Sequence, residues 1–318
     1  MDLAPDFVFK PLPPIADGAE AGAADAEGGP VFSAAAVAPN PLGRLAGLKG
    51  KWSGTGFNVI WRPNSVPGQD RFLELNRTTE TLEFERIPGA IPNRGLLQGD
   101  INMFGLNYLQ QIKDANLDAG LHFEPGIWAH VPKTTDPHEP VTIVRMASIP
   151  HGTTIVAQGT SSASDQTAKP SIPKVSIKPF GIGDPKGTID FPEQDLKTKT
   201  KFRTPAAGLV GVTQTMVDDP NSVLRAAIAH QNITATTRLH VTTAHKPVFG
   251  GGTANTAFLV GGPDGPNAVA ATVTATFWLE KLDNAAEATQ LQYTQTVLLN
   301  FNGLSWPHVT VATLRKTA

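Results

Sequence analysis

The segment Trp278-Leu279-Glu280-Lys281-Leu282-Asp283-Asn284 decides the fold class of this chain of 318 residues. It ends a run rich in Thr, Val and aromatic residues (268–282), and its last two residues suit a tight antiparallel turn. A second β-rich run (288–301) follows directly. Two such runs joined by turn residues predict a β-hairpin, and we take this hairpin as the repeating unit of the fold.

The same pattern of β-rich runs and breaks extends along the chain from Trp52 onward. Gly, Pro, Asn or Asp interrupts the runs at intervals of about ten to fifteen residues, which is typical of a β-meander. Pro150-His151-Gly152 is a second clear hairpin turn. The predicted strands are 52–61, 71–77, 80–86, 105–113, 120–131, 141–148, 153–160, 198–204, 231–243, 268–282, 288–301 and 308–316. One short helix is predicted after Asp219-Pro220, over residues up to 229.

The composition divides the chain into an N-terminal arm (1–45) and a single β-domain (46–318). The arm is rich in proline, alanine and glycine, and is too poor in apolar residues to form a core. It reads either as a stiff linker or as a polyproline segment that a partner could bind. Two insertions, near 161–205 and 245–267, would either roof a pocket or decorate the domain.

Charge and cysteine content narrow the function classes. The chain has no cysteine, which leaves histidine, carboxylate or tyrosine for metal or haem chemistry. A net charge of −2 with dispersed basic residues argues against nucleic acid as a partner. Neither a secretory signal nor a membrane span is expected, so we predict a cytoplasmic protein. An exposed sheet edge or the arm could mediate a homodimer.

Two segments carry the candidate chemistry. His308 follows Pro307, whose fixed φ delivers the histidine into a strand from a rigid corner, as suits a metal ligand. In the strand 120–131, alternation puts His122 and Glu124 on one face and an apolar set on the other. A His-x-Glu pair can be a metal pair, a histidine oriented by a carboxylate, or a surface pair.

Taken together, the motifs resemble the nitrobindin family in their order. They are Gly50-Lys51-Trp52-Ser53-Gly54-Thr55-Gly56, then Leu121-His122-Phe123-Glu124-Pro125-Gly126-Ile127-Trp128, then Pro150-His151-Gly152 with Gly159, and last Pro307-His308 to Arg315. The resemblance covers residues 48–62, 105–160 and 268–316. Ile127, Leu121 and Ala129 depart from the family pattern of an aromatic, a methionine and an arginine.

The resemblance implies an antiparallel up-and-down β-barrel of about ten strands, calycin-like, enlarged by the arm and the insertions. It implies haem b as cofactor, with His308 as axial iron ligand and the sixth iron position open. Leu121 and His122 would form the distal wall, Leu298 would line the cavity, and Tyr293 or Tyr108 would reach a propionate or a distal ligand. Small diatomic or oxyanion ligands would bind the iron, with peroxynitrite isomerisation to nitrate as the implied activity.

Two alternatives stay open. The first is a haem-free carrier that holds a fatty acid or another apolar molecule inside the barrel. The second is a haem-free enzyme in which His122 and Glu124 act as an acid/base pair, although alternation aims both away from the apolar face.

Overall fold

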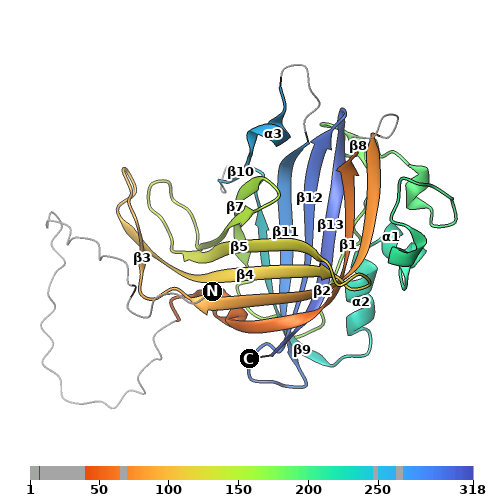
Figure 1. Ribbon diagram of the computed structural model, residues 1–318. Coiled ribbons are helices and arrows are strands. Elements are labelled where there is room, and N and C mark those ends of the chain that lie inside the picture. The colour runs from red at the N-terminus through yellow and green to blue at the C-terminus, as the bar shows by residue number, and fades with distance from the viewer. Residues whose placement is uncertain (1–6, 8–39, 65–69, 246–249, 263–267, 318) are drawn as a thin grey trace, which may run out of the picture.

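Figure 1 shows the computed structural model, which describes residues 7, 40–64, 70–245, 250–262 and 268–317. Most of the predicted arm (1–45) and part of the predicted insertion 245–267 lie outside the described residues. Among the described residues, ten strands close into an antiparallel barrel in the order β1-β2-β4-β5-β6-β7-β9-β11-β12-β13, and β13 pairs back with β1. The predicted all-β antiparallel barrel is therefore confirmed.

The barrel strands follow chain order almost without interruption, as a meander of hairpins predicts. Their bounds are β1 (Gly50–Pro63), β2 (Arg71–Arg86), β4 (Ile101–Asp114), β5 (Gly120–Val131), β6 (Thr142–Ile149), β7 (Thr153–Ser161), β9 (Ile233–Thr242), β11 (Val269–Leu282), β12 (Gln290–Phe301) and β13 (Leu304–Lys316). Three short strands pair at the margins, namely β3 (Ile91–Asn93), β8 (Phe180–Gly181) and β10 (Gly252–Asn255).

Three predictions about strands are wrong. The runs 71–77 and 80–86 form one strand, β2, because Thr78 and Thr79 continue the ladder with β1. The run 198–204 is not a strand, and its β contact is the single bridge of Arg203 to Leu73. Strand β13 begins at Leu304 rather than 308, directly after the turn Asn302-Gly303, whose φ angles of 51° and 74° are those of a tight hairpin.

The predicted helix is present as α2 (Asn221–Ile228), preceded by Pro220. Short helical segments that were not predicted are η1 (Gly43–Leu48), η2 (Pro192–Gln194), η3 (Ala206–Leu209), α1 (Gln214–Asp218) and α3 (Ala257–Val260). Within the described ranges, no helix is long and apolar enough to cross a bilayer.

The barrel interior is filled at one end and hollow at the other. Helix η1 closes the filled end, where Leu45 and Leu48 are fully buried and the indole Nε1 of Trp52 donates to the Leu48 carbonyl at 2.7 Å. Trp128 and Phe277 pack edge-on against each other in the same core, with ring centroids 5.2 Å apart. A cavity lies at the opposite end of the barrel, where Asn58, Ile60 and Arg62 near the end of β1 line it.

A second apolar core lies on the outside of the barrel. The connection between β7 and β9 runs over the outer faces of β1, β2 and β13, where Leu224 and Ile228 of α2 pack with Trp61 and Trp306. Figure 1 shows helices α1 and α2 beside the barrel, to the right of β1 and β13. This insertion is longer than the predicted 161–205, and none of its residues is among those that line the cavity at the hollow end of the barrel.

Strand β5 presents its polar face to the interior, which reverses the expectation from alternation. Glu124 and Trp128 are fully buried, whereas Phe123 is 43% exposed. The reason is an ionic partner on the neighbouring strand: Arg145 of β6 is also buried and forms an ion pair with the Glu124 carboxylate. Hydrophobicity alone could not predict this, because a paired charge tolerates burial that a lone charge does not.

Candidate functional site

The hollow end of the barrel contains a cavity of about 350 Å³. The ends of β1, β4, β5, β12 and β13 and the turn between β6 and β7 surround it. Its apolar wall includes Ile60, Ile112, Leu121, Val273, Val297 and Leu299. Its polar wall includes Asn58, Gln110, His122, His151, Tyr293 and His308. A mixed lining of this kind suits a ligand that is mainly apolar and carries a few polar groups.

His308 faces this cavity from β13. A hydrogen bond to a neighbouring strand fixes the orientation of its imidazole ring. Its Nε2 lies 3.0 Å from the Oδ1 of Asn58 on β1, and the Thr310 hydroxyl donates to the same oxygen at 2.8 Å. Because an amide oxygen only accepts, Nε2 carries the proton and Nδ1 holds a free lone pair. Burial, together with the charges of His122 and His151, lowers the pKa of His308 to about 3. The imidazole is therefore neutral, the form that binds metals.

His122 and Glu124 belong to a buried ionic network that crosses the barrel. Glu124 accepts from Arg145 and Tyr108, and its second oxygen lies 3.1 Å from the Nε2 of His122. Burial raises the pKa of Glu124, but Arg145 and the hydrogen bonds from His122 and Tyr108 outweigh it and lower the pKa to about 2. Glu124 is thus a fixed carboxylate that orients His122, and it does not exchange protons near neutral pH.

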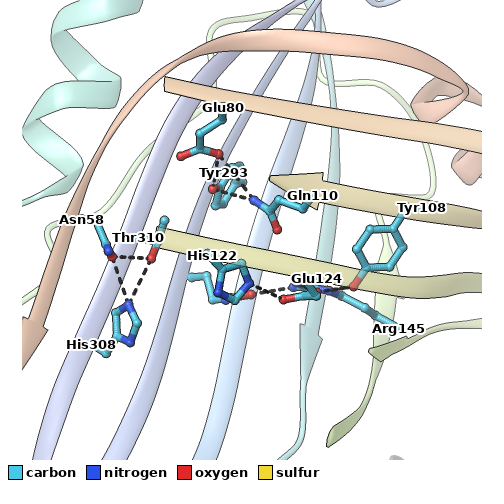
Figure 2. Close-up of polar contacts among 11 residues, drawn as sticks. Asn58, Glu80, Tyr108, Gln110, His122, Glu124, Arg145, Tyr293, His308 and Thr310 are labelled. Atoms are coloured by element: carbon cyan, nitrogen blue, oxygen red, sulfur yellow. Dashed lines mark hydrogen bonds and ion pairs between the residues drawn. The ribbon is translucent and has the colours of Figure 1, made fainter. Parts of the chain in front are cut away.

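Glu80 of β2 is a second buried carboxyl group, and it lies behind the residues that line the cavity. The hydroxyl of Tyr293 is 2.6 Å from Glu80 Oε2, and Gln110 Nε2 donates to that hydroxyl at 2.9 Å. Thr78 donates to the other carboxyl oxygen at 3.1 Å. Figure 2 shows this group beside the His122 network and the His308 site.

His151 closes a split in the barrel wall. The ladder between β5 and β6 ends at Gly126 and Ala147, so the first residues of β5 have no partner strand on that side. The ring of His151 hydrogen-bonds the backbone of Leu121 and lies 5.5 Å from the ring of His122, centroid to centroid. The sequence suggested no more than a turn residue at this position.

The structure brings together four of the five residues predicted for the site: His308, Leu121, His122 and Tyr293 all line the cavity. Leu298 is not among the described residues that line it. Alternation along β12 turns Leu298 to the other face, and its neighbours Val297 and Leu299 line the cavity instead. Tyr108 lies deeper, in the network of Glu124 and Arg145.

Four further residues of the site and its surroundings were not predicted from the sequence, namely Asn58, Gln110, Glu80 and Arg145. A signal existed for Asn58, because it is the polar residue in the otherwise apolar run 57–61, and the first and last strands of a closed barrel are neighbours. Arg145 shows a similar signal, because it is the charged residue in the otherwise apolar run 143–147 of a predicted strand.

No protein-family model matches this chain, and no curated protein matches it. Among solved structures, the crystal structure of Rv2717c from M. tuberculosis is similar, with a TM-score of 0.42 and 13% sequence identity. That match covers 87% of this chain and 98% of the other. A similarity this distant identifies no family. Fold and cavity together define a closed antiparallel β-barrel with a cavity of mixed apolar and polar lining at one end.

Proposed function

We propose that the protein binds haem b in the barrel cavity, with His308 as the axial iron ligand. The observation that carries the proposal is the His308 imidazole itself. It faces the cavity, burial keeps it neutral, and Asn58 holds its Nε2 proton so that the Nδ1 lone pair is available. Orientation of a ligating histidine by a hydrogen bond on its other nitrogen is the usual arrangement at metal sites.

The other residues of the cavity fit a porphyrin in chemistry. Apolar side chains such as Leu121 and Val297 suit the faces of the ring. Arg62 at the rim is 47% exposed and ion-paired with Glu74 at 3.2 Å, and a carboxylate of the ligand would have to share it with Glu74. The described residues hold no cluster of three or more His, Cys, Asp or Glu, so His308 would act as a single protein ligand. The cavity volume is near the lower end of the range for small-molecule pockets, so a porphyrin would project from the open end.

Bound haem would supply an iron whose sixth position can take nitric oxide, peroxide or peroxynitrite. The chain's own residues would exclude bulk water and keep the His308 imidazole neutral. On this basis we propose nitric oxide binding and isomerisation of peroxynitrite to nitrate as the activity to test. The barrel would contribute binding and exclusion, while the cofactor carries the reaction.

The test is a titration of the protein with ferric haem, followed by the Soret absorption band. We expect one haem per chain, and His308→Ala should weaken binding and shift the band. His138→Ala, an exposed position in the loop after β5, is the matched control and should leave both unchanged. Equal spectra and affinities for the wild type and His308→Ala would refute the assignment.

The small volume of the cavity favours a second candidate function, a haem-free carrier of a small apolar molecule. In that case organic extraction of the purified protein would release an apolar ligand. His308→Ala would then leave the amount of bound ligand almost unchanged.

A further inference from the structure

We infer that Glu80 decides whether Tyr293 offers the cavity a hydrogen-bond donor or an acceptor, and so selects the polar group of the ligand. The inference concerns the cavity to which we assign haem, and it rests on that cavity being a binding site. Tyr293 lines the cavity, whereas Glu80 lies behind it and is not among the described lining residues. Glu80 would therefore be a positioning residue that acts through the tyrosine.

The contacts of Tyr293 leave one free position on its hydroxyl. The oxygen lies 2.6 Å from Glu80 Oε2 and accepts from Gln110 Nε2 at 2.9 Å. A phenolic hydroxyl has one proton and two lone pairs. Two of these three positions are used by Glu80 and Gln110, so the third remains for a group in the cavity. Figure 2 shows Tyr293 between these two partners.

The protonation state of Glu80 determines what that third position is. When Glu80 is ionised, Tyr293 must donate its proton to the carboxylate, and a lone pair is left for the cavity. When Glu80 is protonated, its own O–H donates to the Tyr293 oxygen, and the tyrosine proton becomes free to point into the cavity. The second carboxyl oxygen accepts from Thr78 in both states.

Both states of Glu80 are populated near neutral pH. Burial raises the pKa of Glu80 to about 7, against the opposing hydrogen bonds from Tyr293, Thr78 and Gln110 and the charge of His122. The other charged groups that face the pair are Glu124 and Arg145, which interact with Tyr293. These two form an ion pair and do not titrate near neutral pH.

The consequence for ligands follows from the hydrogen-bond count. A group that only accepts, such as a carboxylate or another oxyanion, meets a donor at Tyr293 below about pH 7 and a lone pair above it. A hydroxyl group can donate or accept, so it finds a partner in both states. The cavity should therefore prefer acceptor-only groups more strongly as the pH falls.

Because the chain has two tyrosines, ¹³C labelling of the tyrosine Cζ carbons gives an NMR spectrum with two assignable signals. We expect the Tyr293 signal to move with pH, with a midpoint near 7, and to be flat in Glu80→Gln, whose amide donates permanently. Tyr108 is the internal control because its partner Glu124 stays ionised. Because Glu124 also contacts His122, a change at His122 would move the Tyr108 signal as well.

Glu280→Gln is the matched control variant, because burial also raises the pKa of Glu280 to about 7 but this residue lies outside the cavity lining. It should leave the Tyr293 titration unchanged. A Tyr293 signal that is flat in the wild type, or that still titrates in Glu80→Gln, would overturn the inference. The measurement uses protein without haem, so failure of haem to bind would leave its result intact.

A binding experiment tests the selection itself, with octanoate and octanol as probes. In the wild type, octanoate affinity should fall by up to about tenfold per pH unit above 7, while octanol affinity stays level. Glu80→Gln should keep the tight octanoate binding at pH values above 7. If octanoate does not bind, or if its pH dependence survives in Glu80→Gln, the proposed selectivity is wrong.

Discussion

The hydrogen bond between Asn58 and His308 predicts the effect of a single substitution. Asn58→Leu keeps the approximate volume of the side chain but removes the acceptor that holds the Nε2 proton. Loss of such an orienting contact typically weakens metal binding about 10- to 100-fold. We expect this loss of haem affinity in a spectroscopic titration, carried out at a temperature where the variant is folded. Unaltered affinity would show that Asn58 does not position the histidine.

The raised pKa of Glu280 predicts that the free energy of unfolding depends on pH. Burial raises its pKa to about 7, so the folded state prefers the protonated carboxyl. The contribution of protonated Glu280 to the free energy of unfolding is complete below the ordinary pKa of 4.5, and it is lost as the pH rises through 7. Glu280→Gln should therefore be more stable than the wild type above pH 8, by up to about 3 kcal/mol, and equal to it near pH 4.

Urea unfolding at the two pH values measures this difference. Glu287→Gln, at a side chain that is 81% exposed, is the control and should show no such pH dependence. A constant difference between Glu280→Gln and the wild type across the pH range would contradict the account of Glu280.

At the residue scale, the sequence could predict some of the site and not the rest. Its order of motifs pointed to His308, Leu121, His122 and Tyr293, which all line the cavity. Leu298 was misplaced by one position, and a shift of one residue in a strand reverses the face. Glu80 could not be predicted, because its burial depends on partners that only the closed barrel brings near.

At the scale of single elements, the conformation of the turn between β12 and β13 predicts the effect of a substitution on stability. Gly303 has a φ of 74°, and a Cβ added there would meet nothing within 4 Å. Gly303→Ala therefore costs only the backbone strain of the left-handed conformation, about 1–2 kcal/mol. Gly120→Ala is the matched control, since it also meets nothing and carries no positive φ. Equal unfolding free energies for the two variants would contradict this.

The strands themselves were largely readable from the sequence, because Gly, Pro, Asn and Asp mark the turns of a meander. The wrong strand bounds arose where a strand continued through an expected break or where a turn signal was not used. Thr78 and Thr79 continue β2 across an expected break, and Asn302-Gly303 moves the start of β13 to Leu304. The prediction of which face of β5 points into the barrel was wrong, because an ion pair buries Glu124 and a hydrophobic pattern does not show ion pairs.

For the molecule as a whole, the presence of two apolar cores predicts that a substitution can lower stability without changing ligand affinity. Leu224 of α2 is fully buried in the outer core, on the far side of the wall from the cavity. Leu224→Ala should lower the free energy of unfolding by about 2–5 kcal/mol. Haem affinity, measured at a temperature where the variant is folded, should not change. A fall in affinity similar to that of Asn58→Leu would show that the outer core and the cavity are coupled.

The most direct test of the central claim is the resonance Raman spectrum of the haem-loaded protein in the ferrous state, where an iron–histidine stretching band reports the axial ligand. We predict this band in the wild type and in His151→Ala, and its loss in His308→Ala. A band that persists in His308→Ala, or haem bound without any such band, would contradict the assignment of His308.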